Sequence, residues 1–426
     1  MSSATKLPVE QTTNLNEFAT AKAVVLSQIE ELPTALSQHT VRAGSCVERL
    51  FNQAAKRLDD DRIFISTGDI DAMWLRDSSF QIKPLLRFCN AEPVAEFVRG
   101  VIRSQTFFIS VDPYANAFNS SASGLCWHKD FEDQNPWVFE RKWEIDSLVS
   151  FLDVSLGLLE KTNSSRHMDR EWWIAVERVI SVFEKEQNHD PQTYVFLRPN
   201  APRHDYLYPD GVGRPFANCG LIWSAFRPSD DACELPFNVA QNAYAAAQLE
   251  RLATFAEQPI AARSLRIANE IRGAITNLAV FDEGYSYEVD GLGNSVNMDD
   301  ANIPSLLSLP YLGFCDKDDE IYLKTRRFVL SEKNPWFFSG EQVSHIGSPH
   351  TGANRVWPLA MAMEIITSQN VEIDKLKVLA EIANKSDGLH ESVATDNVQD
   401  FTREWFSWAE MTYVDAVMTA AEKMTL

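Results

Sequence analysis

Carboxylates, an arginine and a tryptophan are concentrated in the stretch "TGDIDAMWLRDSS". Its members suited to binding or catalysis are Asp69, Asp71, Trp74, Arg76 and Asp77. A pyranose offers hydroxyl edges to carboxylates and arginine, and an apolar face to an aromatic ring, so this composition fits a monosaccharide subsite. The alternative is that Asp77 and the two serines after it cap a helix. A cap explains one of these residues and leaves the tryptophan flanked by carboxylates unexplained, because buried carboxylates require partners.

A pair of adjacent aspartates, Asp230 and Asp231, occurs in "FRPSDDACELPFN", just after Arg227. Two neighbouring carboxylates repel each other, which raises the pKa of one toward the working pH and suits it to acid catalysis. The other aspartate would orient it or bind substrate. The alternative is that Ser229 or one aspartate caps the helix expected from near Pro236.

Two further loops contain isolated candidates. In "GLHESVATDNVQDFTREWFSWAEM", Glu391 stands between His390 and Ser392, and either neighbour could help to hold a carboxylate and its attacking water. The ordinary alternative for a single loop glutamate is a solvated surface charge. The aromatic residues of this loop weaken that alternative. In "IGSPHTGANRVWP", His350 is a candidate contact, with a loop-stabilising histidine as the alternative.

The overall charge excludes several classes of partner. The chain has 39 Lys and Arg against 60 Asp and Glu, a formal charge of -21. Nucleic acids and anionic membrane surfaces are bound through clustered basic residues, so both are disfavoured, whereas a neutral sugar is compatible. The N-terminus lacks the pattern of a signal peptide, and no apolar run is long enough to span a bilayer. We therefore expect a cytoplasmic protein with no membrane partner.

Metal, nucleotide and disulfide signatures are missing from the sequence. The six cysteines are scattered singly, without the CxxC pairs of zinc sites. There is no HExxH, no DxDxDG loop, no GxGxxG or Walker loop, and no GxSxG elbow. We therefore expect neither a metal nor another cofactor.

The elements that must position these residues are helices. Apolar residues recur at helical spacing in nine segments, at 16–32, 94–109, 143–161, 172–187, 238–256, 261–275, 356–368, 374–386 and 411–424. Pro84 indicates that any helix after the first cluster starts late or is kinked. Long loops rich in Pro, Gly, Asn and aromatic residues connect the segments. A helical solenoid would show a sequence repeat, and its absence favours helical hairpins closed into a toroid with a pocket at one end.

The chain resembles glycoside hydrolase family 125, the metal-independent exo-α-1,6-mannosidases, over nearly its whole length. The likeness rests on motifs in the family's order: "TGDIDAMWLRDSS", "DPYANAFN", "ERKWEIDSL", "FRPSDDA", "NIPSLLSLPYLG", "IGSPHTG", and "HES" followed by "FTREWFSWA". The resemblance implies an all-α (α/α)6 toroid, six helical hairpins in a ring, as a single catalytic domain over residues 1–426. It also implies metal-independent, inverting hydrolysis that releases mannose from non-reducing ends.

In such a mechanism one carboxylic acid protonates the glycosidic oxygen, while a carboxylate on the opposite face activates water. The motif match assigns the acid to Asp230 or Asp231, with a slight preference for Asp231, and the base to Glu391. The residues expected to bind the sugar are Asp69, Asp71, Trp74, Arg76, Asp77, Arg227, His350 and Arg403.

The expected partner is a mannose-terminated oligosaccharide. The alternatives are another inverting (α/α)6 glycosidase or a phosphorylase, which would use similar carboxylates, and a sugar-binding homologue without catalysis. Retention of both the "SDD" and "HES" motifs speaks against the inactive form.

Overall fold

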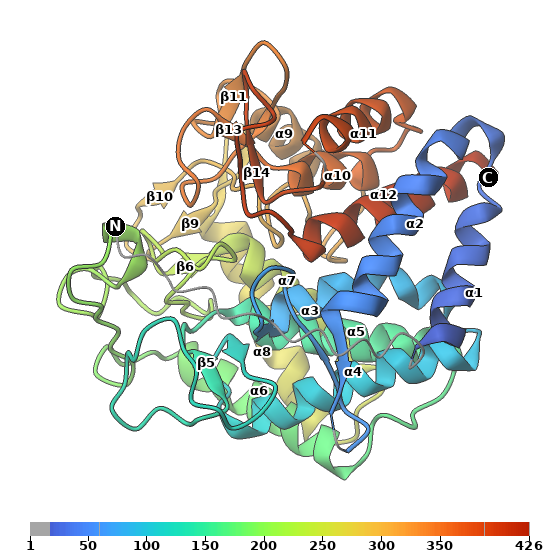
Figure 1. The fold of residues 1–426 in the computed structure, drawn as a ribbon. Helices are drawn as coiled ribbons and strands as arrows, with labels where there is room; N and C mark the ends of the chain where they lie inside the picture. Colours follow the sequence, from blue (N-terminus) through green and yellow to red (C-terminus); the bar gives the residue numbers. More distant parts are fainter. Residues whose placement is uncertain (1–17, 59, 387, 426) are drawn as a thin grey trace.

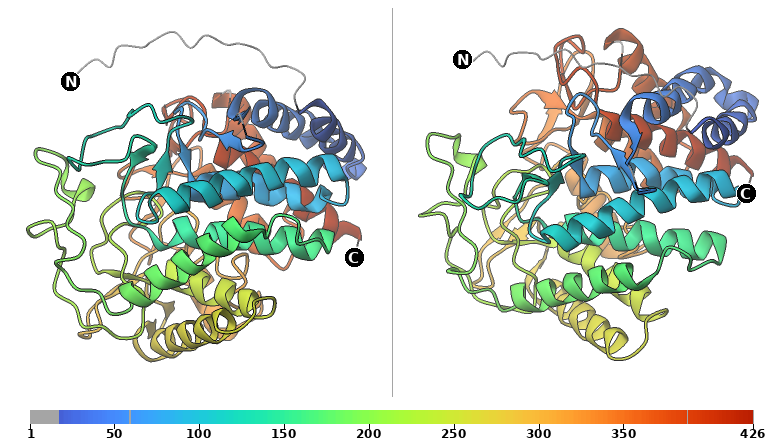
Figure 2. Two further views of the ribbon diagram at one scale, coloured as in Figure 1. Left: turned by 90° about the horizontal axis from the view of Figure 1, so that it is seen from below. Right: turned by 60° about the horizontal axis from the view of Figure 1, so that its bottom comes forward.

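The computed structural model describes residues 18–58, 60–386 and 388–425, and these are mainly helical. The helices lie side by side, and the loops and short strands gather at one end of them, on the left of Figure 1 and of both views in Figure 2. The α-helices are α1 Ala19–Glu30, α2 Thr40–Arg49, α3 Leu75–Ile82, α4 Glu92–Val111, α5 Ile145–Thr162, α6 Arg170–Glu186, α7 Val239–Ala253, α8 Ile260–Leu278, α9 Glu320–Val329, α10 Pro358–Thr367, α11 Ile373–Ser386 and α12 Ser407–Thr425.

An inner ring of helices is surrounded by an outer one. Inside, α3 packs against α5, α5 against α7, α10 against α12, and α12 against α3. The buried turns at 302–314 close the ring, since Gln248 of α7 donates to the carbonyl of Leu312 at 2.9 Å and Tyr311 donates to Asp415 of α12 at 2.7 Å. Outside, α2, α4, α8 and α11 cover α12, α5, α7 and α10 respectively. The predicted all-α (α/α)6 toroid is confirmed.

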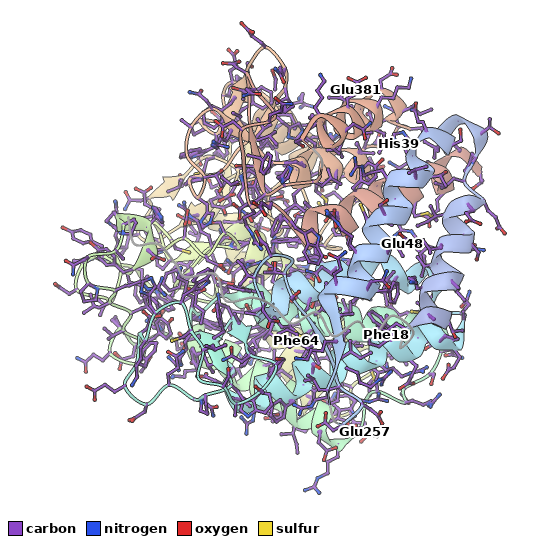
Figure 3. All side chains as sticks on the ribbon, viewed as in Figure 1. Phe18, His39, Glu48, Phe64, Glu257 and Glu381 are labelled. Carbon is purple, nitrogen blue, oxygen red and sulfur yellow. The ribbon has the colours of Figure 1, made fainter. Side chains whose placement is uncertain are left out.

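The two rings differ in how their surfaces are buried. Every residue of α3 is buried, and α7 is buried along most of its length, where its alanines allow close packing. The outer helices are amphipathic and turn charged residues to solvent. In Figure 3, exposed Glu48 and Glu381 lie at the periphery of the molecule, whereas Phe18 and Phe64 belong to the buried core.

Within the described residues, each of the nine predicted segments coincides with a helix, and residues 16 and 17 of the first segment lie outside them. Three further helices of the described residues, α2, α3 and α9, were not predicted. They are short, and α3 is buried on all sides, so it shows no apolar stripe. The α-helix before Pro84 ends at Ile82 and continues as a 3-10 turn over Lys83–Phe88. The capping alternatives are wrong: Asp77 lies inside α3, and the cap of α7 is Asn238, which accepts from the amide of Gln241 at 3.0 Å.

The strands are short and antiparallel, and they form small sheets of two or three strands. They are β1 Ala55–Arg57, β2 Ile63–Ile65, β3 Met73–Trp74, β4 Ala117–Phe118, β5 Val138–Glu140, β6 Phe237–Asn238, β7 Val280–Phe281, β8 Gly284–Tyr285, β9 Glu288–Val289, β10 Ser295–Val296, β11 Phe337–Ser339, β12 Ser344–Ile346, β13 Arg355–Val356, β14 Ser392–Ala394 and β15 Phe401–Thr402. Two of these sheets, β3-β4-β5 and β13-β14-β15, hold loops of the candidate site. Among the described residues, no helix is long and apolar enough to cross a membrane.

Candidate active site

A cavity of about 620 Å³ opens where the inner helices α3 and α12 begin. Segments far apart in the sequence contribute to its wall, as is usual for sites placed at the loop end of a rigid scaffold. Its lining residues are Thr67, Asp69, Ile70, Trp74, Arg76, Asp77, Trp127, His128, Glu140, Lys142, Arg198, Asp205, Pro228, Ser229, Asp230, Asn302, His350, Trp357, Glu391, Arg403, Phe406 and Trp408.

The first cluster reaches the cavity through a strand followed directly by a helix. Trp74 ends β3, where it pairs with Ala117 of β4, and α3 begins at the next residue. The strand fixes the indole, and the first helical turn carries Arg76 and Asp77 into the cavity wall. Asp71 is exposed and does not line the cavity, because it lies in the turn before β3.

The rim of the cavity is held by Asp69 and Arg403. Arg403 Nε donates to Asp69 Oδ1 at 2.8 Å, and the second guanidinium nitrogen also donates to that oxygen and to the carbonyl of Thr67. The backbone of Arg403 has φ 57°, a left-handed conformation that is uncommon for a residue other than glycine. Such strain persists where the surroundings over-determine it, which is common at functional sites.

One guanidinium, that of Arg76, faces four carboxyl groups at the cavity floor. Its Nη1 lies 2.6 Å from Glu144 and 3.4 Å from Asp146. Its Nη2 lies 3.2 Å from Asp230 and 3.3 Å from Asp77. Burial raises the pKa of Asp77, and it raises that of Asp146 to about 6. The floor therefore holds more buried acids than its arginine can compensate, so part of the cluster takes up protons.

A tight turn directs the two adjacent aspartates to different environments. The amide of Arg227 donates to the carbonyl of Asp231 at 2.7 Å, and the amide of Asp230 donates to that of Arg227 at 2.9 Å. Asp230 has φ 64° and lines the cavity, with its side chain 21% exposed. The side chain of Asp231 is only 2% exposed and does not line the cavity. The turn gives the solvent-accessible position to Asp230.

Asp231 holds His350, which does line the cavity. His350 Nδ1 lies 2.9 Å from Asp231 Oδ1. Burial disfavours the charged imidazole, but the hydrogen bond and negative charge of Asp231, with the charges of Glu391 and Asp230, raise the pKa of His350 to about 9. His350 is therefore a cation at neutral pH, facing a cavity with two candidate catalytic carboxylates.

Arg227 lies behind the cavity wall. It forms a bidentate pair with Glu288 of β9, with nitrogen–oxygen distances of 2.6 and 2.9 Å. Glu288 is fully buried and also accepts the amides of Glu234 and Leu235, each at 3.0 Å. The pair fixes the start of the loop that carries Asp230, so the structure gives Arg227 no direct contact with the cavity.

Glu391 enters the cavity from the residue before β14, which pairs with β13 and β15 on either side. Its neighbour His390 points elsewhere: the ring stacks on Phe401 at 3.6 Å between centroids, and Nδ1 lies 2.7 Å from the carbonyl of Arg403. His390 thus ties together the loops that carry Glu391 and Arg403. Glu391 is buried, with 8% of its surface exposed, so the alternative of a solvated surface charge is wrong.

Several polar groups of the cavity wall have no hydrogen-bond partner among the described residues. They include Trp74 Nε1, Ser229 Oγ and Trp408 Nε1, all of them buried. Leaving such groups unpaired costs free energy, roughly 1–3 kcal/mol each. These atoms lie inside the wall, and the groups that the cavity presents to a ligand are its charged side chains and aromatic rings.

Sequence reasoning missed a set of charged residues on the outer wall, Glu140, Lys142, Arg198 and Asp205. Lys142 Nζ donates to Asp205 at 2.7 Å and to the carbonyl of Asp230 at 2.8 Å, so it also supports the turn that carries Asp230. Two of these residues stand in the motif "ERKWEIDSL", whose dense charge was the available signal. In the described ranges, no group of three or more His, Cys, Asp or Glu is arranged to hold a metal ion.

The ring of helical hairpins with a carboxylate-lined cavity at one end defines the class of six-hairpin glycosidases. A solved structure described only as a wild-type glycosidase shares this fold, with a TM-score of 0.55 over 94% of this chain and 98% of its own. The identity between the two sequences is 15%, so this likeness concerns the fold alone.

Within that class, the chain belongs to the metal-independent α-mannosidases of glycoside hydrolase family 125, which it matches over residues 30–418. A Streptococcus pneumoniae metal-independent α-mannosidase, solved in a non-productive complex with α-1,6-mannobiose, is 33% identical, with a TM-score of 0.89 over 95% of this chain and 98% of its own. The meiotically up-regulated gene 157 protein of Schizosaccharomyces pombe is 36% identical over 84% of this chain and 77% of its own. The family resemblance seen in the motifs is confirmed.

Proposed function

We propose that this protein is an exo-acting, inverting α-1,6-mannosidase that hydrolyses terminal non-reducing mannose from α-1,6-linked mannosides or glycans. The observation that carries the proposal is that Asp230 and Glu391, from distant segments, line one cavity together with other charged side chains and aromatic rings. The α-1,6-mannobiose bound to the Streptococcus pneumoniae relative supports the linkage.

Asp230 is the general acid in this proposal. Of the two adjacent aspartates it is the one whose carboxyl is accessible from the cavity, and an acid must reach the glycosidic oxygen. Asp231, which the sequence slightly favoured, acts instead through His350. The cationic imidazole offers a hydrogen bond to a hydroxyl group of the bound sugar and offsets part of the negative charge around it.

Glu391 is the general base. It accepts a proton from a water molecule as the water oxygen attacks the anomeric carbon, on the face opposite the leaving oxygen. The burial of Glu391, which is 8% exposed, limits the positions that this water can take, which favours attack from one face only. The product of this single displacement has the β configuration.

The closed end of the cavity suits a terminal sugar. Arg76 and Asp77 form its floor, with the indoles of Trp74 and Trp408 in the wall, so a pyranose can meet both charged and apolar surfaces. Trp127, at 53% exposed, lies at the mouth, where the leaving sugar of an exo-acting enzyme would extend toward solvent.

The test is hydrolysis of α-1,6-mannobiose beside α-1,2- and α-1,3-mannobiose, with and without inorganic phosphate. We expect mannose release from the α-1,6 isomer at a rate that phosphate does not change. Mannose 1-phosphate formation would indicate a phosphorylase, and binding without release from any isomer would indicate a sugar-binding protein.

A further inference from the structure

Glu144 is a buried carboxyl group directly beside the proposed acid. It lies at the N-terminal end of α5, is 0% exposed, and does not itself line the cavity. Asn116 Nδ2 lies 3.3 Å from both Glu144 Oε1 and Asp230 Oδ1, so one amide bridges the two carboxyl groups. Glu144 and Asp230 are also hydrogen-bonded to each other. Two carboxyl groups in such contact are held together by one shared proton.

Burial and the surrounding charges decide where that proton rests. Glu144 is 0% exposed whereas the side chain of Asp230 is 21% exposed, so a negative charge is better solvated on Asp230. The groups that face this pair are Arg76 and Asp77 on α3, Asp146 on α5, and Lys142 and His350 from the loops on either side. Burial and the negative charge of Asp230 raise the pKa of Glu144 well above its usual range, against the opposing charge of Arg76 at 2.6 Å. Burial alone would also raise the pKa of Asp230, but the charge of Arg76 and the hydrogen bond from Glu144 lower it to about 2.

This arrangement conflicts with a general acid that works alone. An acid catalyst must carry a proton near the working pH, and Asp230 beside Arg76 is ionised there. Its neighbour carries the proton instead, one hydrogen bond away from the group that faces the substrate. Asp146 also contacts Arg76, at 3.4 Å, but its hydrogen bonds do not include Asp230.

We propose that Glu144 is a positioning residue that stores the proton delivered by Asp230. This rests on the proposed function, in which Asp230 protonates the glycosidic oxygen. As the bond from the anomeric carbon to that oxygen breaks, its electron pair stays on the oxygen. The single proton of the pair moves from Glu144 to Asp230 and from Asp230 to that oxygen in the same step, which leaves both carboxylates ionised beside Arg76.

The protons released and taken up by the protein balance over one turnover. The attacking water forms the new bond to the anomeric carbon and gives one proton to Glu391. Glu391 then releases that proton to solvent, and the Glu144–Asp230 pair takes one up, so the sum of the reaction is one water consumed. No group is oxidised or reduced.

The experiment compares Glu144→Gln with wild type on α-1,6-mannobiose and on 2,4-dinitrophenyl α-mannoside, whose leaving group needs no protonation. Glutamine keeps the shape and the contact with Arg76 but stores no proton. We expect mannobiose hydrolysis to fall by about 100-fold or more, while the activated substrate stays within about five-fold. The alkaline limb of the mannobiose pH profile should move down by about one pH unit or more.

Asp153→Asn is the matched control, because Asp153 is a buried carboxylate of the same helix that pairs with Lys83 and Arg251 and does not line the cavity. It should leave both substrates within about five-fold of wild type. Unchanged mannobiose activity in Glu144→Gln, equal loss on both substrates in a folded Glu144→Gln, or the same selective loss in Asp153→Asn would each overturn the proposal.

Asp230→Asn separates this inference from the proposed function. If Asp230→Asn spares mannobiose hydrolysis, the assignment of the acid fails and the inference fails with it. If Asp230→Asn abolishes it and Glu144→Gln does not, only the inference fails. If Glu144→Gln does not fold, the pH profile of the wild-type protein decides. An alkaline limb above about pH 5 that appears with mannobiose and not with the activated substrate supports a stored proton. An alkaline limb below about pH 4 contradicts it.

Discussion

His350 Nδ1 lies 2.9 Å from Asp231 Oδ1, so the second of the two adjacent aspartates is engaged by a side chain while the first faces the cavity. The turn from Arg227 to Asp231 creates this division, because it holds Asp230 in a left-handed conformation. Two residues of the same type, next to each other in the chain, therefore have different surroundings, and we propose different tasks for them.

Replacement of the two aspartates should separate these tasks. We expect Asp230→Asn to lower kcat for α-1,6-mannobiose by about 10³-fold and to spare 2,4-dinitrophenyl α-mannoside, because only the poor leaving group needs an acid. Asp231→Asn should lower both activities by a similar, smaller factor of about ten, since it acts through His350. Steady-state kinetics on both substrates checks this, and a substrate-selective loss in Asp231→Asn would reverse the assignment.

Removal of the base should affect every substrate. We expect Glu391→Gln to lower kcat by about 10³-fold on mannobiose and on the activated mannoside alike, because water attack is needed in both reactions. Added azide should restore turnover of the activated mannoside and form β-mannosyl azide, which NMR identifies. Retention of activity on the activated substrate would show that Glu391 is not the base.

The stability of the protein should depend on pH through His350. Its pKa of about 9 lies above the ordinary histidine value, so the stabilisation by Asp231 is fully present below about pH 6.5 and is lost as pH rises through 9. The difference in Tm between wild type and Asp231→Asn should therefore be largest near pH 6 and shrink toward pH 10. Two parallel Tm curves across this range would contradict the pairing.

Arg227 should matter for stability more than for substrate binding. Arg227→Met leaves the buried carboxylate of Glu288 unpaired, which typically costs about 3–5 kcal/mol, and the double variant Arg227→Met/Glu288→Gln should recover part of that loss. Urea unfolding measures both effects. A rise in KM without a change in unfolding free energy would support the sequence-based hypothesis that Arg227 binds the sugar.

Trp127 should contribute to holding the leaving sugar. Its ring packs on Phe139 at 5.6 Å between centroids, and Phe139 packs on Trp74 at 5.7 Å. The Trp127 ring is therefore supported by two further aromatic rings. Trp127→Ala should lower kcat/KM for mannobiose about 3- to 10-fold and leave α-mannosyl fluoride unchanged, because fluoride offers no sugar ring to stack. Leu125→Ala, an exposed residue outside the cavity wall, is the control. Equal losses on both substrates would contradict a role of Trp127 in holding the leaving sugar.

The candidate site could be predicted best where its residues are contiguous. Trp74, Arg76 and Asp77 form one strand-to-helix junction, so a single short stretch contains the floor of the cavity. Glu391 could be found because its loop is unusually rich in aromatic residues. In each case the local composition carries the signal.

The other site residues depend on contacts between distant segments, which local sequence patterns do not encode. Arg227 and Asp71 have suitable side chains but point away from the cavity, because backbone turns decide their direction. Arg198 reaches the outer wall from a segment without any motif, and Glu144 gains its chemistry only from Asp230, which follows 86 residues later. Among the helices, α3 could not be predicted because it is buried on all sides, and the short amphipathic helices α2 and α9 were also missed.

The most direct test of the whole account is the anomeric form of the first product. Hydrolysis of α-1,6-mannobiose by the wild-type enzyme, followed by ¹H NMR before mutarotation, should show β-mannose first, with α-mannose appearing only as the sugar equilibrates. This result requires an acid and a base on opposite faces of the sugar, as Asp230 and Glu391 are proposed to be. Initial release of α-mannose would contradict the inverting mechanism and both assignments.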